Sequence, residues 1–252
     1  MYILRTEGLT KDFDGLRAVD DVDLRVEAGT IHSVIGPNGA GKTTLFNCLT
    51  GFEKPSEGKI FFEEEDITGL PGYRVSHLGI TRSFQITSLF PDLSVLENVR
   101  IALQSRENVN MNFFSSLKGL KRIETRAWEI LDVIGLRDFG KEKAANLDYG
   151  SKRCLEIGIA LGTDPRLLLF DEPTSGMDTE ESARIISLIQ DIAINKTIVL
   201  VEHNIEAVLQ ISNSITVLQQ GRMIARGTPA EIQNNETVQE AYLGGYKPHV
   251  AG

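Results

Sequence analysis

The chain has 252 residues, which is enough for one large domain, or for a domain with a subdomain, around a sizeable buried core. Its 26 lysine and arginine residues are outnumbered by 35 aspartate and glutamate residues, so the net charge is −9. Neutralising nucleic-acid phosphates requires a basic patch. The charge balance therefore disfavours nucleic-acid binding as the main activity and is compatible only with a local basic site.

Three further features indicate a soluble, cytoplasmic chain. Cys48 and Cys154 lie far apart within predicted helices and read as buried thiols in a reducing compartment, not as a disulfide. No apolar run reaches the roughly 18–20 residues of a membrane span. Residues 1–7 have the pattern of a strand and not of a signal peptide. If the chain works at a membrane, another subunit has to supply the span.

The first 30 residues have the alternating pattern of antiparallel strands. Strands are predicted over residues 2–6 and 22–26, separated by polar turns such as Asp14-Gly15. Phe13 lies in the polar stretch between them. On this segment alone, its ring is as compatible with a structural aromatic plug as with a face for stacking a nucleotide base.

A complete phosphate-binding loop follows the next predicted strand, over residues 30–35. The pattern G-x-x-x-x-G-K-[ST] is matched in full between this strand and a helix predicted over 44–50. The matched stretch comprises Gly36, Pro37, Asn38, Gly39, Ala40, Gly41, Lys42, Thr43 and Thr44.

The residue types of this loop suit a nucleoside triphosphate. Its glycines let backbone N–H groups turn inward around a polyphosphate, and the positive end of the following helix points at the same anion. Lys42 is placed to reach the β- and γ-phosphates, and the Thr43 hydroxyl to ligate Mg²⁺. The alternative, a glycine-rich turn without a ligand, explains a full match in this context less well.

The region that follows contains short elements. A strand is predicted over 59–62, a short helix over 73–78 and a strand over 80–85. The acidic run 63–66 could bind a cation, but adjacent carboxylates without spacing usually form a solvated turn.

Residues 86–163 are predicted to form an inserted helical subdomain. Ser94 and Glu97 make a capping box for one helix, and an apolar stripe over 123–134 marks another. Apolar side chains in the polar loop 111–117 indicate either a partner contact or a flap over the domain's own core.

Residues 164–227 return to alternating strands and helices, which predicts a parallel sheet. Buried strands over 166–170 and 197–201 end in Asp171-Glu172 and in Glu202-His203. Ligands of such sheets lie at the carboxyl ends of the strands, so the phosphate loop, Asp171, Glu172 and His203 are expected at one edge. A helix over 182–193, a closing hairpin over 215–225 and a final helix over 228–246 complete the prediction.

The ordered series of motifs resembles the nucleotide-binding subunit of ATP-binding-cassette (ABC) transporters over nearly the whole chain. The resemblance implies an α/β P-loop fold with a mainly parallel, RecA-like core sheet, an N-terminal antiparallel β-subdomain and an inserted α-helical subdomain. The implied division is a core of residues 1–85 and 164–227, a helical subdomain of 86–163, and a C-terminal helix and tail of 228–252.

The same resemblance implies residue roles. Phe13 would stack on the base, Asp171 would hold Mg²⁺ through water, and Glu172 would act on the attacking water. Gln85 would sense the γ-phosphate and Mg²⁺, and His203 would contact the γ-phosphate. Two such subunits would sandwich two ATP molecules, each bound by one subunit's phosphate loop and the other's signature. The D-loop of the family is matched by Ser175, Gly176, Met177 and Asp178.

One motif departs from the family. The usual signature is L-S-G-G-Q, whereas the aligned residues here, called the signature segment below, are Leu147, Asp148, Tyr149, Gly150 and Ser151. Asp148 replaces the serine that would donate to the γ-phosphate of the partner's ATP, and a carboxylate repels phosphate. At 4 Å this repulsion costs about 1–4 kcal/mol. The helix N-terminus offsets roughly 0.3–1 kcal/mol of it. Because the repulsion exceeds this offset, the ATP site built with this signature is predicted to be weaker than a standard one. The alternative is that Asp148 simply caps its helix.

Several shorter stretches, among them residues 82–85 and 238–244, resemble import ATPases for branched-chain amino acids and for urea and short amides. The implied partners are a second ABC ATPase subunit, identical or different, integral membrane permease subunits and, indirectly, a solute-binding protein, with the chain at the cytoplasmic face of the membrane. One alternative is a soluble ABC-type ATPase acting on ribosomes or nucleic acid. Another is a weakly hydrolysing regulatory cassette, which Asp148 favours and which Glu172 with His203 argues against.

Overall fold

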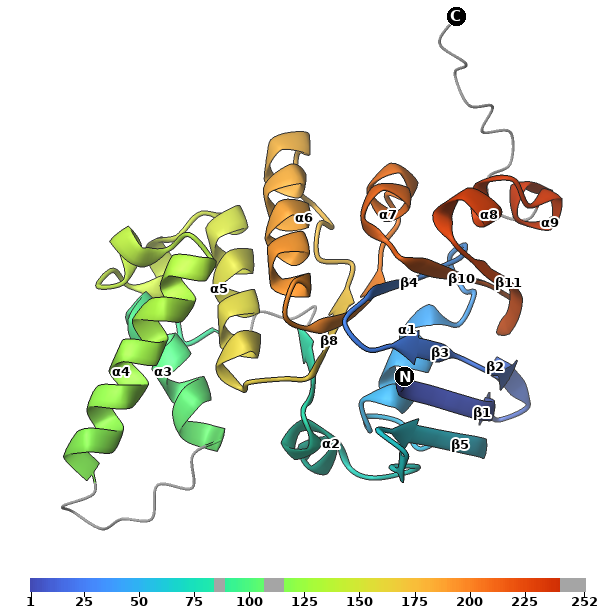
Figure 1. Ribbon diagram of the computed structural model, residues 1–252, viewed down its shortest axis with the longest axis horizontal. Helices are drawn as coiled ribbons and strands as arrows, with labels where there is room; N and C mark the ends of the chain where they lie inside the picture. Colours follow the sequence, from blue (N-terminus) through green and yellow to red (C-terminus); the bar gives the residue numbers. More distant parts are fainter. Residues whose placement is uncertain (84–88, 107–115, 241–252) are drawn as a thin grey trace, which may run out of the picture. The chain divides into compact units, whose positions relative to one another are not determined.

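The computed structural model describes residues 1–83, 89–106 and 116–240. The chain forms two compact units, shown in Figure 1: a first unit of Met1–Gly72 with Thr197–Gly252, and a second unit of Tyr73–Lys196. This division follows from contacts within each unit. The predicted boundaries of a helical subdomain at 86 and 163 stay a prediction.

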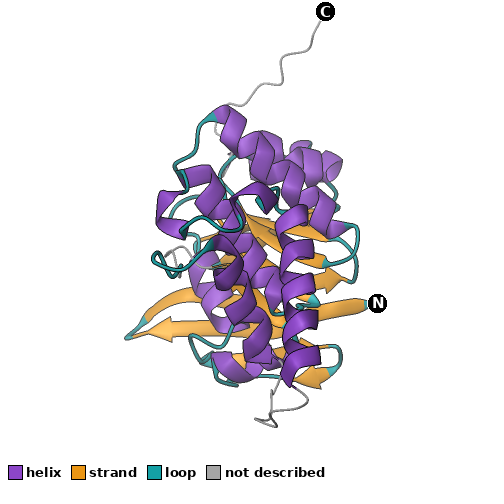
Figure 2. Cartoon of the chain, turned by 90° about the vertical axis from the view of Figure 1, so that its left-hand side faces the viewer, coloured by secondary structure: helices purple, strands orange, loops and turns teal. Residues whose placement is uncertain are grey.

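An antiparallel sheet opens the first unit, as predicted. Its strands, drawn in orange in Figure 2, are β1 (Tyr2–Phe13), β2 (Leu16–Val22), β3 (Arg25–Glu27), β5 (Glu57–Phe62) and β6 (Glu65–Asp66). β1 pairs with β2, β3 and β5, and the turn between β1 and β2 is made by Asp14 and Gly15, both at positive φ.

The strand predicted over 22–26 is interrupted, which corrects the sequence prediction. β2 ends at Val22 and β3 begins at Arg25, and the two pair with different parts of β1. The Asp23 carboxylate accepts a hydrogen bond from the Gly8 amide at 2.7 Å, so this residue joins the strands by its side chain instead of continuing one of them. The acidic run 63–66 forms an exposed hairpin turn with Glu63 and Glu64 at positive φ, as expected of a solvated turn.

A mainly parallel sheet forms the rest of the first unit. Its order is β11 (Arg222–Gly227), β10 (Ser214–Gln219), β4 (Ile31–Ile35) and β9 (Thr197–Val201). β4 is parallel to both neighbours, and every residue of β4 and β9 is buried. A strand buried on both faces is typically a continuous apolar run, as in β9, whereas β4 is mostly apolar but also buries His32 and Ser33.

Helices cover this sheet. They are α1 (Lys42–Leu49), α7 (Ile205–Ile211), α8 (Pro229–Gln233) and α9 (Glu236–Val238). Val208, Ile232 and Val238 from the last three helices pack with Ile35 and Val217 of the sheet in one buried cluster.

The prediction of one helix over 228–246 is wrong within the described residues. Two short helices, α8 and α9, replace it, and they are separated at Asn234-Asn235. Thr228 and Glu231 form a capping box for α8, and the Asn235 side chain accepts from the Val238 amide. An asparagine that caps a new helix competes with continuation of the previous one. Residues 241–246 lie outside the described part of the chain.

The second unit combines one strand pair with helices. The strands β7 (Ile80–Ser83) and β8 (Leu167–Asp171) are parallel. The helices are α2 (Gly72–Leu78), α3 (Val95–Arg106), α4 (Ser116–Val133), α5 (Tyr149–Gly162) and α6 (Thr179–Ala193), with short 3₁₀ turns at Arg137–Phe139 and Ala144–Asn146. The predicted strand 80–85 is confirmed as far as Ser83, and the loop 111–117 lies mainly outside the described residues.

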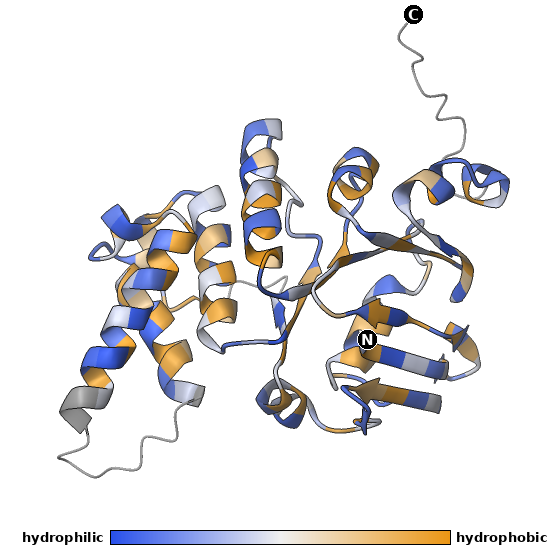
Figure 3. Cartoon of the chain, viewed as in Figure 1, coloured by the Kyte–Doolittle hydropathy of each residue, from blue (hydrophilic) through white to orange (hydrophobic). Residues whose placement is uncertain are grey.

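Helices α3, α4 and α5 pack together as the sequence pattern predicted. The Ser94–Glu97 capping box is present, with the Glu97 carboxylate accepting from the Ser94 amide at 2.8 Å. Along α4 the apolar residues alternate with polar ones (Figure 3), and Ile123 and Leu131 on its inner face are buried. α5 approaches closely, because a side chain at Gly158 would lie 2.6 Å from Ile134.

Both cysteines are free and buried, as expected. Burial raises the pKa of the Cys48 thiol to about 11, so it stays protonated at neutral pH. Among the residues described, no helix is both long enough and apolar enough to cross a bilayer.

Candidate functional site

The phosphate loop connects β4 to α1 and is built on three glycines with positive φ, at 155° for Gly36, 78° for Gly39 and 100° for Gly41. The backbone of neighbouring segments lies close to Gly36 and Gly41. A Cβ at Gly36 would lie 2.2 Å from the Leu218 carbonyl oxygen, and one at Gly41 would lie 2.2 Å from the Ala18 carbonyl oxygen. Glycine is therefore required here both for conformation and for space.

The loop presents donors toward an anion. α1 begins at Lys42 with Gly41 as its cap and no side-chain cap bond, so its first amides have no partner within the helix. The Lys42 ammonium is buried and donates to the carbonyls of Gly36 at 2.7 Å and of Pro37 at 3.0 Å. It is thereby folded back over the loop, within reach of a phosphate placed in it. The Thr43 side chain next to it is exposed.

His203 lies at the same edge of the first unit as the phosphate loop. β9 runs parallel to β4 with Val201 level with Val34, so His203 follows its strand as Gly36 follows β4. His203 is exposed, whereas Glu202 is buried and its carboxylate accepts from the His203 amide at 3.1 Å. The predicted meeting of these two motifs at one strand edge is thus found in the described structure.

Phe13 ends β1 in the same unit and is 41 % exposed. The Lys11 ammonium lies 4.6 Å from the centre of its ring. A side chain this exposed is not a buried structural plug. The stacking of Phe13 on a nucleotide base stays a prediction.

Asp171 ends β8 in the second unit, and Glu172 follows it directly. Asp171 is buried, and its Oδ2 accepts a hydrogen bond from the Arg82 guanidinium at 2.5 Å. The other oxygen, Oδ1, is buried without a hydrogen-bond partner among the described residues. The ion pair on Oδ2 fixes the orientation of the carboxylate and leaves Oδ1 as an acceptor. Such an oxygen fits the coordination of Mg²⁺ through a water molecule.

Glu172 is held in an unusual backbone conformation. Its φ is 50°, in the left-handed region that a non-glycine residue seldom adopts. Such strain persists where surrounding contacts fix it, and it clusters at functional sites.

The signature segment forms the N-terminus of α5. Asp148 is the N-cap, and its carboxylate accepts from the Ser151 amide at 2.6 Å. This bond is the main reason that the pKa of Asp148 lies below its usual value, so the group is charged at neutral pH. Leu147, Gly150 and Ser151 are buried. The capping role considered from the sequence is confirmed.

Asp178 has a comparable role at the start of α6, where its carboxylate accepts from the Glu181 amide at 2.9 Å within a capping box. Gln85 lies outside the described residues.

Two contacts in the second unit are not predicted by the sequence. The sequence gives Arg82 no site role, and it predicts Tyr149 as a nucleotide-binding residue of the signature without a contact inside its own chain. Arg82 pairs with Asp171, and the Tyr149 hydroxyl donates to the Ser175 carbonyl at 3.0 Å.

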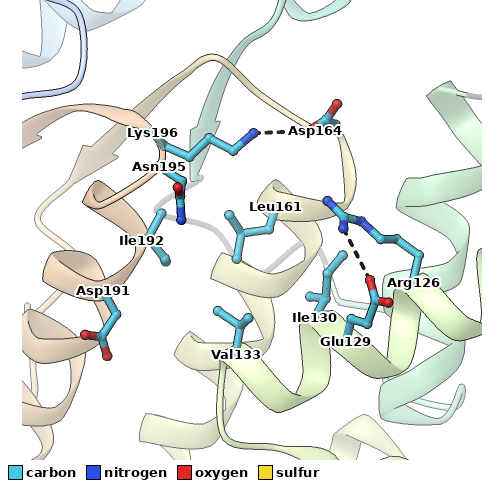
Figure 4. A pocket seen from close by; sticks show the side chains of 10 residues that line it. All are labelled: Arg126, Glu129, Ile130, Val133, Leu161, Asp164, Asp191, Ile192, Asn195 and Lys196. Atoms are coloured by element: carbon cyan, nitrogen blue, oxygen red, sulfur yellow. Dashed lines mark hydrogen bonds and ion pairs between the residues drawn. The ribbon is translucent and has the colours of Figure 1, made fainter.

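A cavity of about 230 Å³ in the second unit is separate from these residues (Figure 4). Its floor is aliphatic, and both of its rim cations are already paired, Arg126 with Glu129 at 3.2 Å and Lys196 with Asp164 at 3.0 Å. None of the predicted site residues lines it.

Comparison with known proteins decides the family. The sequence profile of the ABC transporter family matches residues 19–175, well over half of the chain. The chain belongs to the ABC transporter family. It is an ATP-binding protein and ATP hydrolase of that family, as predicted. A second profile, that of the branched-chain amino acid ATP-binding cassette transporter, matches residues 222–247 of this ABC ATPase.

Individual relatives agree in sequence and fold. The high-affinity branched-chain amino acid transport ATP-binding protein BraF of Pseudomonas aeruginosa is 41 % identical to this ABC ATPase, over 96 % of the chain and 98 % of BraF. The ADP conformation of MJ1267, an ATP-binding cassette of an ABC transporter, is 31 % identical with a TM-score of 0.85, covering 97 % of this chain and 100 % of that one. The dimeric post-hydrolysis structure of the cassette MJ0796, bound to ADP and Pi, is 25 % identical with a TM-score of 0.76, covering 90 % and 98 %. The predicted cassette fold is confirmed.

Proposed function

We propose that this ABC ATPase powers the import of branched-chain or related amino acids through separate membrane subunits. The observation that carries the proposal is the match of residues 222–247 to the branched-chain amino acid transporter profile, since this C-terminal segment lies outside the general ABC match. The full-length similarity to BraF supports the same substrate class. In this proposal the chain works at the cytoplasmic face of the membrane, and the permease subunits recognise and carry the amino acid.

The proposal assigns a role toward ATP to each of the predicted site residues. The phosphate loop amides and Lys42 would bind the triphosphate, Phe13 would stack on the base, and Thr43, Gln85 and Asp171 would hold Mg²⁺. When bound there, the metal would supply neutralisation of the phosphate charge. Glu172 accepts the proton of the attacking water, and His203 contacts the γ-phosphate.

The proposed working form is a dimer of cassettes. The dimeric cassette MJ0796, with ADP and Pi bound, is the precedent for this arrangement. In such a dimer, the signature segment (147–151) and Asp178 of one subunit face the nucleotide on the other. If the second cassette is identical to this chain, both ATP sites contain Asp148. If it is a different cassette, this chain contributes Asp148 to only one of them.

The test is purification of the tagged chain from membranes of its own organism, followed by reconstitution of whatever multi-span proteins accompany it. If the chain powers import, the reconstituted vesicles should take up labelled leucine or valine in an ATP-dependent way, and ribosomes or RNA should not stimulate ATP turnover. Stimulation by ribosomes or RNA, with no membrane partner recovered, would instead support the soluble ATPase.

A further inference from the structure

Tyr149 makes a contact that reaches from α5 to the loop after β8. It is the first residue of α5 and is 51 % exposed, yet its hydroxyl donates to the Ser175 main-chain carbonyl at 3.0 Å. Its ring lies beside Gly176, where an added Cβ would be 3.5 Å from the hydroxyl oxygen and 3.9 Å from the ring carbons. The side chain therefore lies along the backbone of this loop.

The loop that Tyr149 contacts also carries Glu172. The Ser175 amide donates to the Glu172 carbonyl at 3.1 Å, and the Met177 amide donates to the Thr174 carbonyl at 3.2 Å. These are two successive tight turns between β8 and α6. Since Glu172 itself has a φ of 50°, its conformation depends on how the following residues are held.

The other end of the contact is fixed as well. Asp148 caps α5 immediately before Tyr149, and Gly150 immediately after it packs on α6, where an added Cβ would lie 3.1 Å from Glu181 Oε1. Glu181 is in turn the capping-box partner of Asp178. The residues on either side of Tyr149 are therefore fixed, Asp148 by capping α5 and Gly150 by packing against α6.

We propose that Tyr149 is a positioning residue for Glu172. Its hydroxyl holds the Ser175 carbonyl, and the Ser175 amide in turn holds the Glu172 carbonyl, so the carboxylate is kept where it can take the proton of the attacking water. This inference rests on the proposed role of Glu172. Small displacements of a catalytic group lower the rate of the chemical step without changing substrate binding.

The test is the Tyr149→Phe variant in the assembled transporter. The change removes the hydroxyl and keeps the ring beside Gly176. Tyr2→Phe is the matched control, because Tyr2 is also partly exposed and its ring contact with Arg226, at 6.0 Å, survives in phenylalanine. For each variant kcat, KM for ATP and the melting temperature are measured.

The expected result for Tyr149→Phe is a fall in kcat of about three- to tenfold, which is what loss of one hydrogen bond supplies. KM for ATP should stay within about twofold, because the phosphate loop is untouched and the only group removed from the signature segment is a hydroxyl that already donates to Ser175 of its own chain. The melting temperature should stay within about 2 °C, since the lost bond is exposed. Tyr2→Phe should match the wild type in all three.

Three results would overturn the inference: an unchanged kcat, a raised KM at unchanged kcat, or a lowered melting temperature with unchanged turnover per folded molecule. A Glu172→Gln variant separates this failure from failure of the catalytic assignment. If Glu172→Gln retains turnover, the role of Glu172 is wrong and the positioning role falls with it. If Glu172→Gln abolishes turnover while Tyr149→Phe behaves as the wild type, only the role of Tyr149 is wrong.

Discussion

Arg82 balances the buried charge of Asp171. The side chains are 9 % and 0 % exposed, and the charged atoms approach to 2.5 Å. Removing one partner of such a pair leaves an uncompensated buried charge, which costs about 3–5 kcal/mol. We therefore expect Arg82→Met to lower the free energy of unfolding by that amount, measured by chemical denaturation in the absence of nucleotide and Mg²⁺.

The control for this change is Arg126→Met. Arg126 pairs with Glu129 at 3.2 Å, but both side chains are 56 % exposed. Exposed pairs contribute about 0–1 kcal/mol, so this variant should differ little from the wild type. Equal effects of the two substitutions would show that the Asp171 carboxylate does not depend on Arg82.

Asp148 is the residue that sets this signature apart from the family. It is charged at neutral pH and caps α5, so its replacement must keep the cap if the charge alone is to be tested. Serine and asparagine are both good N-caps. We expect Asp148→Ser and Asp148→Asn to raise the ATPase rate of the assembled transporter about threefold or more at low ATP, because each would remove a carboxylate from the signature that is proposed to face the partner's phosphate. An unchanged rate in both would remove the charge explanation.

At the scale of an element, substitution of a phosphate-loop glycine tests whether the neighbouring backbone holds the loop. At Gly41 an added methyl meets the Ala18 carbonyl, and φ is 100°, so crowding and strain act together. Gly29 has a φ of 73° but open space around it. We expect Gly41→Ala to cost about 2–5 kcal/mol of unfolding free energy and Gly29→Ala about 1–2 kcal/mol. Similar losses in equilibrium denaturation would mean that the loop is not held by the neighbouring backbone.

Elements with local signals were predictable from the sequence. Glycine spacing predicts the phosphate loop, and apolar runs predict the buried strands β8 and β9. β4 is predicted from a mostly apolar, β-branched stretch that also contains His32 and Ser33. The prediction of a single final helix over 228–246 is wrong within the described residues, because Asn235 caps a new helix.

Contacts between distant residues were not predictable in this way. Arg82 and Asp171 are 89 residues apart, and Tyr149 and Ser175 are 26 apart. Neither pair has a periodic pattern or a turn signal. Both follow from how β7 and β8, and α5 and the loop after β8, come together in the second unit.

At the scale of the whole molecule, His32 makes stability depend on pH. It is fully buried in β4, and its ring nitrogens lie 2.7 Å from the Ser214 hydroxyl and 2.9 Å from the Thr216 hydroxyl. Burial lowers its pKa to about 3, with a smaller contribution from Arg226. Between pH 6.5 and 3 the unfolded chain therefore binds a proton that the folded chain does not, and stability falls as pH falls through this window.

Between pH 7 and pH 5 this effect should remove about 2 kcal/mol from the free energy of unfolding. Denaturation curves of the wild type and of His32→Gln across this range test it, because the glutamine amide can serve both hydroxyls without titrating. The variant should show a correspondingly flatter pH profile. Parallel profiles would mean that the acid sensitivity arises elsewhere.

The proposed role of Glu172 is to take the proton of the water that attacks ATP. The direct measurement is single-turnover ATP hydrolysis by Glu172→Gln in the assembled transporter, with ATP binding followed in parallel. The control is Glu180→Gln, an exposed glutamate in the first turn of α6. The expected result is a loss of about 100-fold or more in rate for Glu172→Gln, with ATP still bound, and no change for Glu180→Gln. Hydrolysis at the wild-type rate by Glu172→Gln would contradict the claim.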